Sequence, residues 1–209
     1  GRVFFSVGLH PGYVEHNWKA QLDGLADFWT ASPKPVALGE IGLDYFRLPK
    51  DEGEAQKIKD FQQLAFREQL NLACRLNIPV IVHSRNAFFD CVRLIDESGV
   101  NWKKVVFHCF SEGIPEIEQL IERGGLASFT GILTFKKNDQ LREAALRQGI
   151  ENLMIETDSP YLAPEPKRGK MNEPAFLHHI GQYAANLFDV PQEFLAKKTF
   201  TRTEEFYGV

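Results

Sequence analysis

Six short apolar segments, spread along the whole chain and separated by helix-like stretches, constrain this fold more than any other feature. Most are near-continuous apolar runs, which is typical of strands buried on both faces of a parallel sheet. The alternation of strand and helix predicts an α/β fold in which crossovers join parallel strands. The expected strands are Val3–Gly8, Val36–Gly42, Pro79–His83, Val105–Phe110, Leu126–Ile132 and Leu153–Asp158.

Helical periodicity lies between these segments. Apolar residues in the range 58–76 recur at spacings of three, four and seven, which predicts a helix with one apolar stripe. A second helix is expected to open at Pro115 and to close at Gly124. Two more helices are expected to start at Pro174 and Pro191. No linker or low-complexity segment interrupts this order, so we expect a single domain over residues 1–209.

Composition narrows the function classes. The chain is 44% hydrophobic and 25% charged, which suits a soluble protein with a substantial core. Its net charge of −4 and pI of about 5.9 do not favour a protein that holds nucleic acid mainly by counterion release. These values do not exclude a nuclease that binds phosphate locally, through metal ions and a few cationic side chains.

The three cysteines, Cys74, Cys91 and Cys109, have no spacing typical of a disulfide framework. No apolar run approaches the roughly 20 residues that a membrane span needs. The first residues do not resemble a signal peptide. We therefore expect a cytoplasmic protein without a membrane partner.

Polar residues interrupt or end five of the six apolar runs: His10, Glu40, His83, His108 and Asp158. Each alone has a simpler explanation, such as a hydrogen-bonded core histidine or a turn cap. In an α/β barrel, however, the carboxyl ends of the strands converge on one mouth. Burying these groups there without a cation would be costly. Imidazole and carboxylate are common ligands of divalent metals, so the pattern predicts a hydrolytic metal site.

Six motifs occur in order and at suitable spacings: GLHP, GEIGLDY, PVIVHSR, FHCFSEG, IETDSPYL and RGKMNEPA. Together they make the chain, from about Val3 to Gly208, resemble the TatD family of metal-dependent deoxyribonucleases. The resemblance implies a TIM-like (β/α) barrel. It also implies a site for two divalent metal ions, with Mg, Mn or Zn as candidates.

The resemblance also assigns roles. Glu40 would bridge the two ions, and His83 and His108 would bind one of them. Asp158 would bind the other ion and help to orient or deprotonate the attacking water, and His10 would lie near the substrate phosphate.

Three cations are further candidates for substrate binding. Arg85 follows two residues after His83 and is a candidate phosphate ligand, with an ordinary ion pair as the alternative. Arg168 and Lys170 follow the last expected strand, where barrels often hold phosphate. A solvated basic loop is the alternative for this pair.

The sequence departs from the family at its start, because no His-x-His strand occurs. The match begins at what resembles the third strand, so about the first two strands of eight are absent. The chain is either a fragment of a longer protein or a shortened barrel. We favour a fragment, because six strands would leave two exposed edges. In the family, the His-x-His pair supplies two ligands to the ion that Asp158 also binds. A chain without that strand could therefore hold only one of the two ions.

These observations lead to one main hypothesis and two alternatives. The main hypothesis is a deoxyribonuclease of the exonuclease type, a monomer that binds its DNA substrate transiently. The first alternative is a metal-dependent ester or amide hydrolase, such as a D-aminoacyl-tRNA deacylase. The second is an inactive truncated form.

Overall fold

The computed structural model describes residues 3–209, in which strands and helices alternate as expected. The chain divides into two compact units of similar size, with the boundary after Val106. None of the helices in the described part of the chain is both long and apolar enough to cross a membrane.

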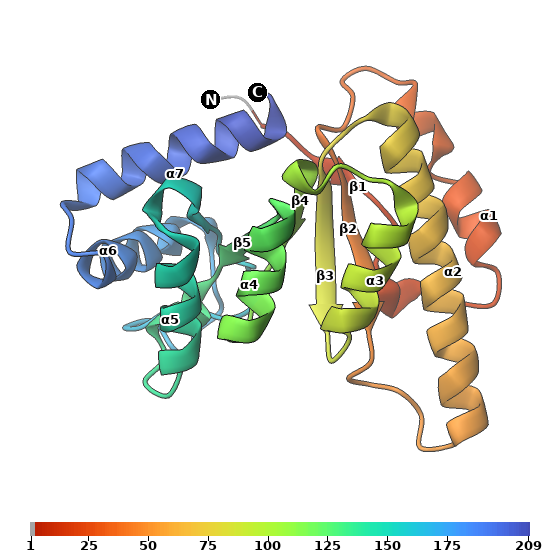
Figure 1. Cartoon of the computed structure of the whole chain (residues 1–209), viewed down its shortest axis with the longest axis horizontal. Coiled ribbons are helices and arrows are strands. Elements are labelled where there is room, and N and C mark those ends of the chain that lie inside the picture. The colour runs from red at the N-terminus through yellow and green to blue at the C-terminus, as the bar shows by residue number, and fades with distance from the viewer. Residues whose placement is uncertain (1–2) are drawn as a thin grey trace. The chain divides into compact units, whose positions relative to one another are not determined.

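The first unit is a parallel sheet flanked by helices (Figure 1). Helix α2 packs on β2 and α3, and α1 contacts α2. The strands are β1 (Ser6–Val7), β2 (Ala37–Asp44) and β3 (Val80–Arg85), and the helices are α1 (Trp18–Asp23), α2 (Glu52–Leu76) and α3 (Phe88–Ser98).

Helix α2 forms because its ends are capped and one face is apolar. The Asp51 side chain accepts a hydrogen bond from Glu54 N–H at 2.8 Å and so satisfies a backbone donor of the first turn. Asn77 ends the helix with φ +52°, in the left-handed region. The fully buried side chains of Phe66 and Leu70 lie on the apolar face.

The second unit contains its own parallel strand pair, β5 with β6. Helices α4 and α5 contact β5, while α6 and α7 contact β6. Strand β4 (Val105–Phe107) spans the boundary between the units. The other strands are β5 (Leu126–Phe129) and β6 (Met154–Ile155), and the helices are α4 (Ile114–Arg123), α5 (Asp139–Gln148), α6 (Leu177–Leu187) and α7 (Gln192–Tyr207).

A buried glutamine joins α5 to β5. The side chain of Gln148 accepts a hydrogen bond from Ala127 N–H and donates one to Ala127 O, both at 2.8 Å. The same amide donates to Asn152 O at 2.8 Å, ahead of β6. One side chain therefore satisfies three backbone groups and fixes the start of both strands.

The expected elements agree with those observed, apart from their ends. Each of the six apolar segments overlaps a strand. Strands β2 and β3 extend two residues beyond the expected ends, and β1 and β6 have only two residues. Pro174 opens a 3₁₀ turn, and α6 begins at Leu177; such turns are frequent at helix starts. The α/β class with parallel strands is confirmed.

Candidate metal centre

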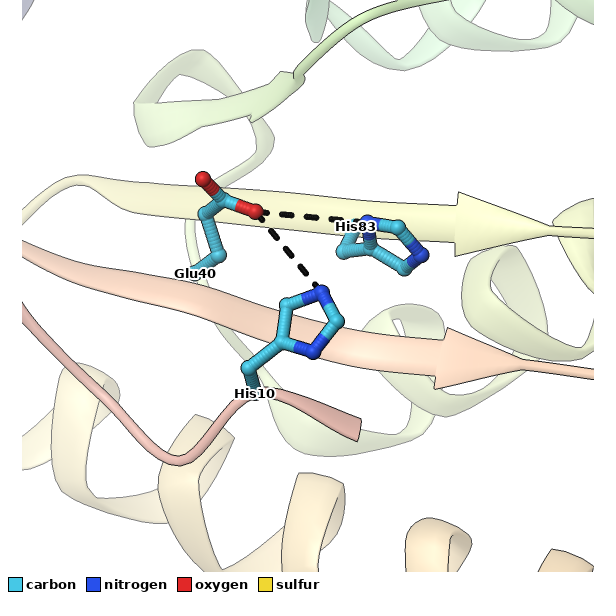
Figure 2. Close-up of side chains that lie close together, drawn as sticks. All are labelled: His10, Glu40 and His83. Atoms are coloured by element: carbon cyan, nitrogen blue, oxygen red, sulfur yellow. Dashed lines mark ion pairs between the residues drawn. The ribbon is translucent and has the colours of Figure 1, made fainter. Parts of the chain in front are cut away.

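Three side chains of the first unit converge at the carboxyl end of its sheet: His10, Glu40 and His83 (Figure 2). One ligand atom from each lies within 4.8 Å of the other two. Glu40 Oε2 is 3.8 Å from His10 Nε2 and 4.0 Å from His83 Nδ1. Both distances are too long for hydrogen bonds. They are shorter than the about 4.4 Å that two metal–ligand bonds of about 2.2 Å can span.

An irregularity in β2 presents Glu40 to this cluster. The pairing of β2 with β3 shifts between Leu38 and Ile41, so β2 carries one extra residue there. Such a bulge re-aims a side chain, often beside an active site. The strand approaches β3 closely on both sides of Glu40. A Cβ atom at Gly39 would lie 2.5 Å from Ile81 Cβ. A Cβ atom at Gly42 would lie only 2.0 Å from the carbonyl oxygen of His83 in β3.

The environment of His83 makes it suitable as a metal ligand. Its Nε2 lies 3.3 Å from Asp44 Oδ2. A carboxylate only accepts hydrogen bonds, so we assign the proton to Nε2. The lone pair of the neutral ring then sits on Nδ1, which faces Glu40. A carboxylate that fixes the tautomer in this way is typical of metal-bound histidines.

His10 has the opposite arrangement. Its Nδ1 accepts a hydrogen bond from Gly12 N–H at 3.0 Å, at the start of a 3₁₀ turn (Pro11–Tyr13). A neutral imidazole has one donor and one acceptor, so Nε2 carries the proton. The His10 ring lies edge-on to His83, with the ring centroids 4.4 Å apart. His10 therefore offers the cluster a hydrogen-bond donor, and would have to give up the Gly12 bond to bind a metal.

Two buried glutamines of α2 hold the backbone that carries this cluster. The Gln69 amide accepts from Leu9 N–H at 2.7 Å and donates to Leu9 O at 3.1 Å, immediately before His10. The Gln62 amide makes the same pair of bonds with the backbone of Asp44, at 2.9 and 3.1 Å. Sequence reasoning did not single out these residues. The available signal is two polar residues seven apart beside the apolar stripe of a long helix.

The segment after β2 is fixed by further hydrogen bonds. Asp44 Oδ1 accepts from Phe46 N–H at 2.9 Å. The Tyr45 hydroxyl donates to Asp90 at 3.2 Å and accepts from Gln63 at 2.9 Å. Burial, helped by the Asp90 charge and opposed by the Gln63 hydrogen bond, raises the pKa of Tyr45 to about 12. Tyr45 therefore stays a neutral structural donor at physiological pH.

The second unit contains another imidazole–carboxylate pair, immediately after β4 and β6. His108 Nδ1 lies 3.3 Å from Glu156 Oε2. The other carboxylate oxygen accepts from Cys109 N–H at 2.7 Å and from the Ser128 hydroxyl at 2.5 Å. Burial by itself raises the pKa of Glu156, but the hydrogen bonds from His108, Ser128 and Cys109 outweigh it, so the pKa is lowered. The ionised carboxylate assigns the proton to His108 Nδ1 and the lone pair to Nε2.

Backbone strain marks the same strand ends. Cys109, which follows His108, has φ +47°, and Asp158, which follows β6, has φ +53°. Residues other than glycine adopt this left-handed region at a cost of order 1–3 kcal/mol, and they cluster at functional sites. The predicted ligands of the second unit, His108 and Asp158, therefore lie next to or at a strained residue that the surrounding structure holds in place.

Both candidate phosphate-binding arginines stack on a phenylalanine. The guanidinium carbon of Arg85 is 3.6 Å from the ring centroid of Phe46, in the first unit. That of Arg168 is 3.7 Å from the centroid of Phe135, in the second unit. Lys170 is exposed in the same loop as Arg168, where its N–H donates to Lys167 O at 3.1 Å.

A protein family described as TatD related DNase matches residues 1–208. The chain belongs to the TatD family. It is 40% identical over 197 residues to an uncharacterized metal-dependent hydrolase, YcfH, of Escherichia coli K12. The matched region covers 94% of this chain and 71% of that relative. It is 33% identical over 216 residues to the 3'-5' ssDNA/RNA exonuclease TatD of Citrobacter rodentium, covering 98% and 76%.

Solved TatD structures agree with this assignment. YJJV, a TatD homolog of Escherichia coli K12, has a TM-score of 0.87 at 26% identity, over 99% of this chain and 77% of that one. A TatD family hydrolase of Entamoeba histolytica has a TM-score of 0.82 at 26% identity, over 99% and 75%. The family, the TIM-like barrel class and metal-dependent hydrolysis are confirmed as predicted.

This TatD chain brings together two of the four predicted ligands, Glu40 and His83, with His10 as the third group of the candidate metal site. The other two, His108 and Asp158, lie in the second unit. The carboxylates of Asp44 and Glu156 each lie 3.3 Å from a ring nitrogen of His83 and His108, respectively.

Proposed function

We propose that this TatD protein is a divalent-metal-dependent nuclease that hydrolyses phosphodiester bonds of DNA and releases nucleotides from an end. The observation that carries the proposal is the cluster of His10, Glu40 and His83. It joins a carboxylate, an imidazole lone pair and an imidazole N–H donor from three adjacent strand segments. The Citrobacter rodentium relative, named as a single-stranded DNA and RNA exonuclease, supports nucleic acid as the substrate.

In this proposal Glu40 and His83 hold a divalent ion. A bound ion would supply Lewis-acid polarisation of the phosphodiester and activation of water. Asp44 keeps the lone pair of His83 directed at the site by accepting a hydrogen bond from Nε2–H. His10 Nε2–H donates a hydrogen bond to a non-bridging phosphate oxygen. Nε2 is the donor because Nδ1 of the same ring accepts the hydrogen bond from Gly12 N–H.

We assign the remaining predicted roles to residues of both units. In the second unit, His108 would bind metal through Nε2, and Asp158 would bind the second ion of the family site and accept the proton of the attacking water. Arg85, Arg168 and Lys170 hold phosphates of the bound strand. Guanidinium groups suit this task because their fork of N–H donors matches phosphate oxygens.

The test is metal-dependent release of nucleotides from labelled single-stranded DNA with Mg²⁺ or Mn²⁺. Glu40→Gln preserves side-chain volume but removes the charge. We expect it to lower the rate by more than about a hundredfold, beyond the 10–100-fold typical of outer-shell partners. Glu122→Gln, an exposed position on α4, is the matched control and should leave the rate unchanged.

Two results would overturn the proposal: release that survives EDTA, or release that is equal in Glu40→Gln and wild type. A parallel panel with RNA, a D-aminoacyl-tRNA and small lactones separates phosphodiester hydrolysis from the ester and amide alternatives. Calorimetric titration of metal into both variants gives a second readout, in which Glu40→Gln should lose binding.

A further inference from the structure

A hollow of about 430 Å³ lies between two loops of the second unit. One loop follows β5 and contains a 3₁₀ turn (Gly131–Thr134), and the other follows β6. Three of its four charged groups are cations, although the whole chain has a net charge of −4. The hollow is lined by Phe135, Lys136, Lys137, Asn138, Glu165 and Arg168.

The backbone that carries the two lysines is rigid. The Arg142 guanidinium donates to the carbonyl oxygens of Leu133 at 3.1 Å, Phe135 at 2.8 Å and Lys136 at 3.3 Å. It also pairs with Asp139 in the first turn of α5. One partly buried guanidinium thus ties the β5 loop to the helix that follows, so the lysines project from a fixed segment.

The two loops are also held to each other. The Thr134 hydroxyl accepts a hydrogen bond from Glu165 N–H at 2.9 Å and donates one to Gly131 O at 2.7 Å. A Cβ atom at Gly131 would lie 2.2 Å from Leu162 O, so only glycine permits this approach. The hollow is therefore a built feature of this unit.

The stacked pair of Arg168 and Phe135 forms one wall. The guanidinium carbon lies 3.7 Å from the ring centroid, and this cation–π contact restrains the arginine side chain. A fixed guanidinium offers N–H donors at its edge for phosphate and a flat face for an unstacked base. The exposed ammonium groups of Lys136 and Lys137 add two point charges.

We propose that this hollow binds the sugar–phosphate backbone of a single-stranded nucleic acid. Cations that track the backbone, beside an aromatic or guanidinium platform for a base, are the features by which proteins hold single strands without sequence preference. The hollow lies between the loops after β5 and β6, and the β6 loop also contains Asp158. The inference rests on the proposed function and adds a second contact region for the same substrate.

The experiment measures binding of a fluorescent twelve-nucleotide oligothymidylate, and of a thymidine dinucleotide, in EDTA so that no hydrolysis occurs. The test variant is Lys136→Ala/Lys137→Ala. The control is Lys197→Ala/Lys198→Ala, which removes an adjacent lysine pair from α7 outside the hollow.

We expect the test variant to bind the twelve-nucleotide strand about tenfold more weakly. The slope of log K against log salt should fall by about 1.4, because each lost phosphate contact on a single strand contributes about 0.7. The control should stay within about twofold of wild type. The advantage of the long strand over the dinucleotide should shrink only in the test variant.

Equal losses in both lysine variants, or no loss in the test variant, would overturn the inference. So would a twelve-residue polyglutamate that binds as tightly as the DNA through the same two lysines, because the hollow would then select an acidic protein. Hydrolysis in Mn²⁺ is scored separately. If wild type cleaves DNA but its binding ignores the hollow, only this inference fails. If wild type binds through the hollow but cleaves nothing, the proposed function fails instead.

Discussion

The two units each contain an imidazole–carboxylate pair, but the pairs use the ring in opposite ways. In the first unit Asp44 takes the Nε2 side of His83 and leaves Nδ1 for Glu40. In the second unit Glu156 takes the Nδ1 side of His108 and leaves Nε2 on the other side of the ring. Each histidine therefore acquires its tautomer from a carboxylate of its own unit.

The carboxylates themselves are held differently. Asp44 accepts hydrogen bonds from one backbone N–H and from His83, and the side chain of Gln62 holds the backbone of Asp44. Glu156 accepts from His108, a backbone N–H and a hydroxyl, which together lower its pKa. The first pair thus depends on the shape of its strand, and the second on a local hydrogen-bond network. This difference predicts which changes disturb each pair.

The largest effect should follow from Gly42→Ala, which disturbs the strand behind the first pair. Its Cβ would lie 2.0 Å from His83 O, and φ at this position is +141°. Overpacking and backbone strain together predict a loss of about 3 kcal/mol or more in the free energy of unfolding. Urea unfolding measures it. Gly99→Ala is the control, since that glycine also has positive φ (+74°) but nothing within 4 Å; it should cost about 1–2 kcal/mol. Equal losses at both positions would contradict the close approach.

The second effect is on metal affinity. Asp44→Asn can present an N–H to His83 and so move the ring proton to Nδ1. We expect divalent-metal binding to weaken about 10–100-fold, as for other outer-shell partners. Calorimetry gives the affinity, and Asp27→Asn, an exposed aspartate in a separate 3₁₀ turn, is the control. Unchanged affinity in Asp44→Asn would show that this carboxylate does not set the tautomer.

The third effect concerns the tautomers directly. In the metal-free protein, ¹⁵N spectra of the imidazoles should show a proton on Nε2 of His83 and on Nδ1 of His108 at a pH where both rings are neutral. Glu156→Gln should reverse the assignment of His108 and leave His83 unchanged. The same tautomer at both histidines in wild type would remove the contrast between the two pairs.

The smallest effect is on the cysteines beside the two histidines. Cys91 Sγ lies 3.9 Å from His83 O, and burial raises the pKa of Cys91 to about 12. Cys109, next to His108, is partly exposed, and Cys74 is exposed. At pH 8, iodoacetamide should therefore modify Cys74 fastest, Cys109 more slowly and Cys91 only after unfolding, as mass spectrometry can follow. Rapid labelling of Cys91 in the native protein would contradict its burial.

Much of this architecture could be predicted from the sequence because it depends on patterns of few residue types. Apolar runs located all six strands, and the interruptions at Glu40 and His83 located residues that do converge. The same interruption pattern included His10, but the orientation of its ring could not be predicted. It depends on a 3₁₀ turn and on the Gly12 contact that orients the ring.

Other features could not be predicted because they need three-dimensional neighbours. The bulge in β2 is visible only from its pairing with β3. Glutamines on an amphipathic helix look like ordinary surface residues until the strands bring Leu9 and Asp44 against Gln69 and Gln62. The His108–Glu156 pair joins residues 48 positions apart, and no local spacing encodes that contact.

The glutamine clamps have a consequence for the timescale on which the site opens. Leu9 lies outside β1, where backbone N–H groups usually exchange with solvent quickly, yet its proton is held by the buried amide of Gln69. Exchange at Leu9 then requires α2 to separate from this segment, as does exchange at Asp44 through Gln62. Deuterium uptake at these two positions should follow the unfolding of α2 itself. The segment that carries His10 and the end of β2 are therefore as long-lived as the longest helix of the first unit.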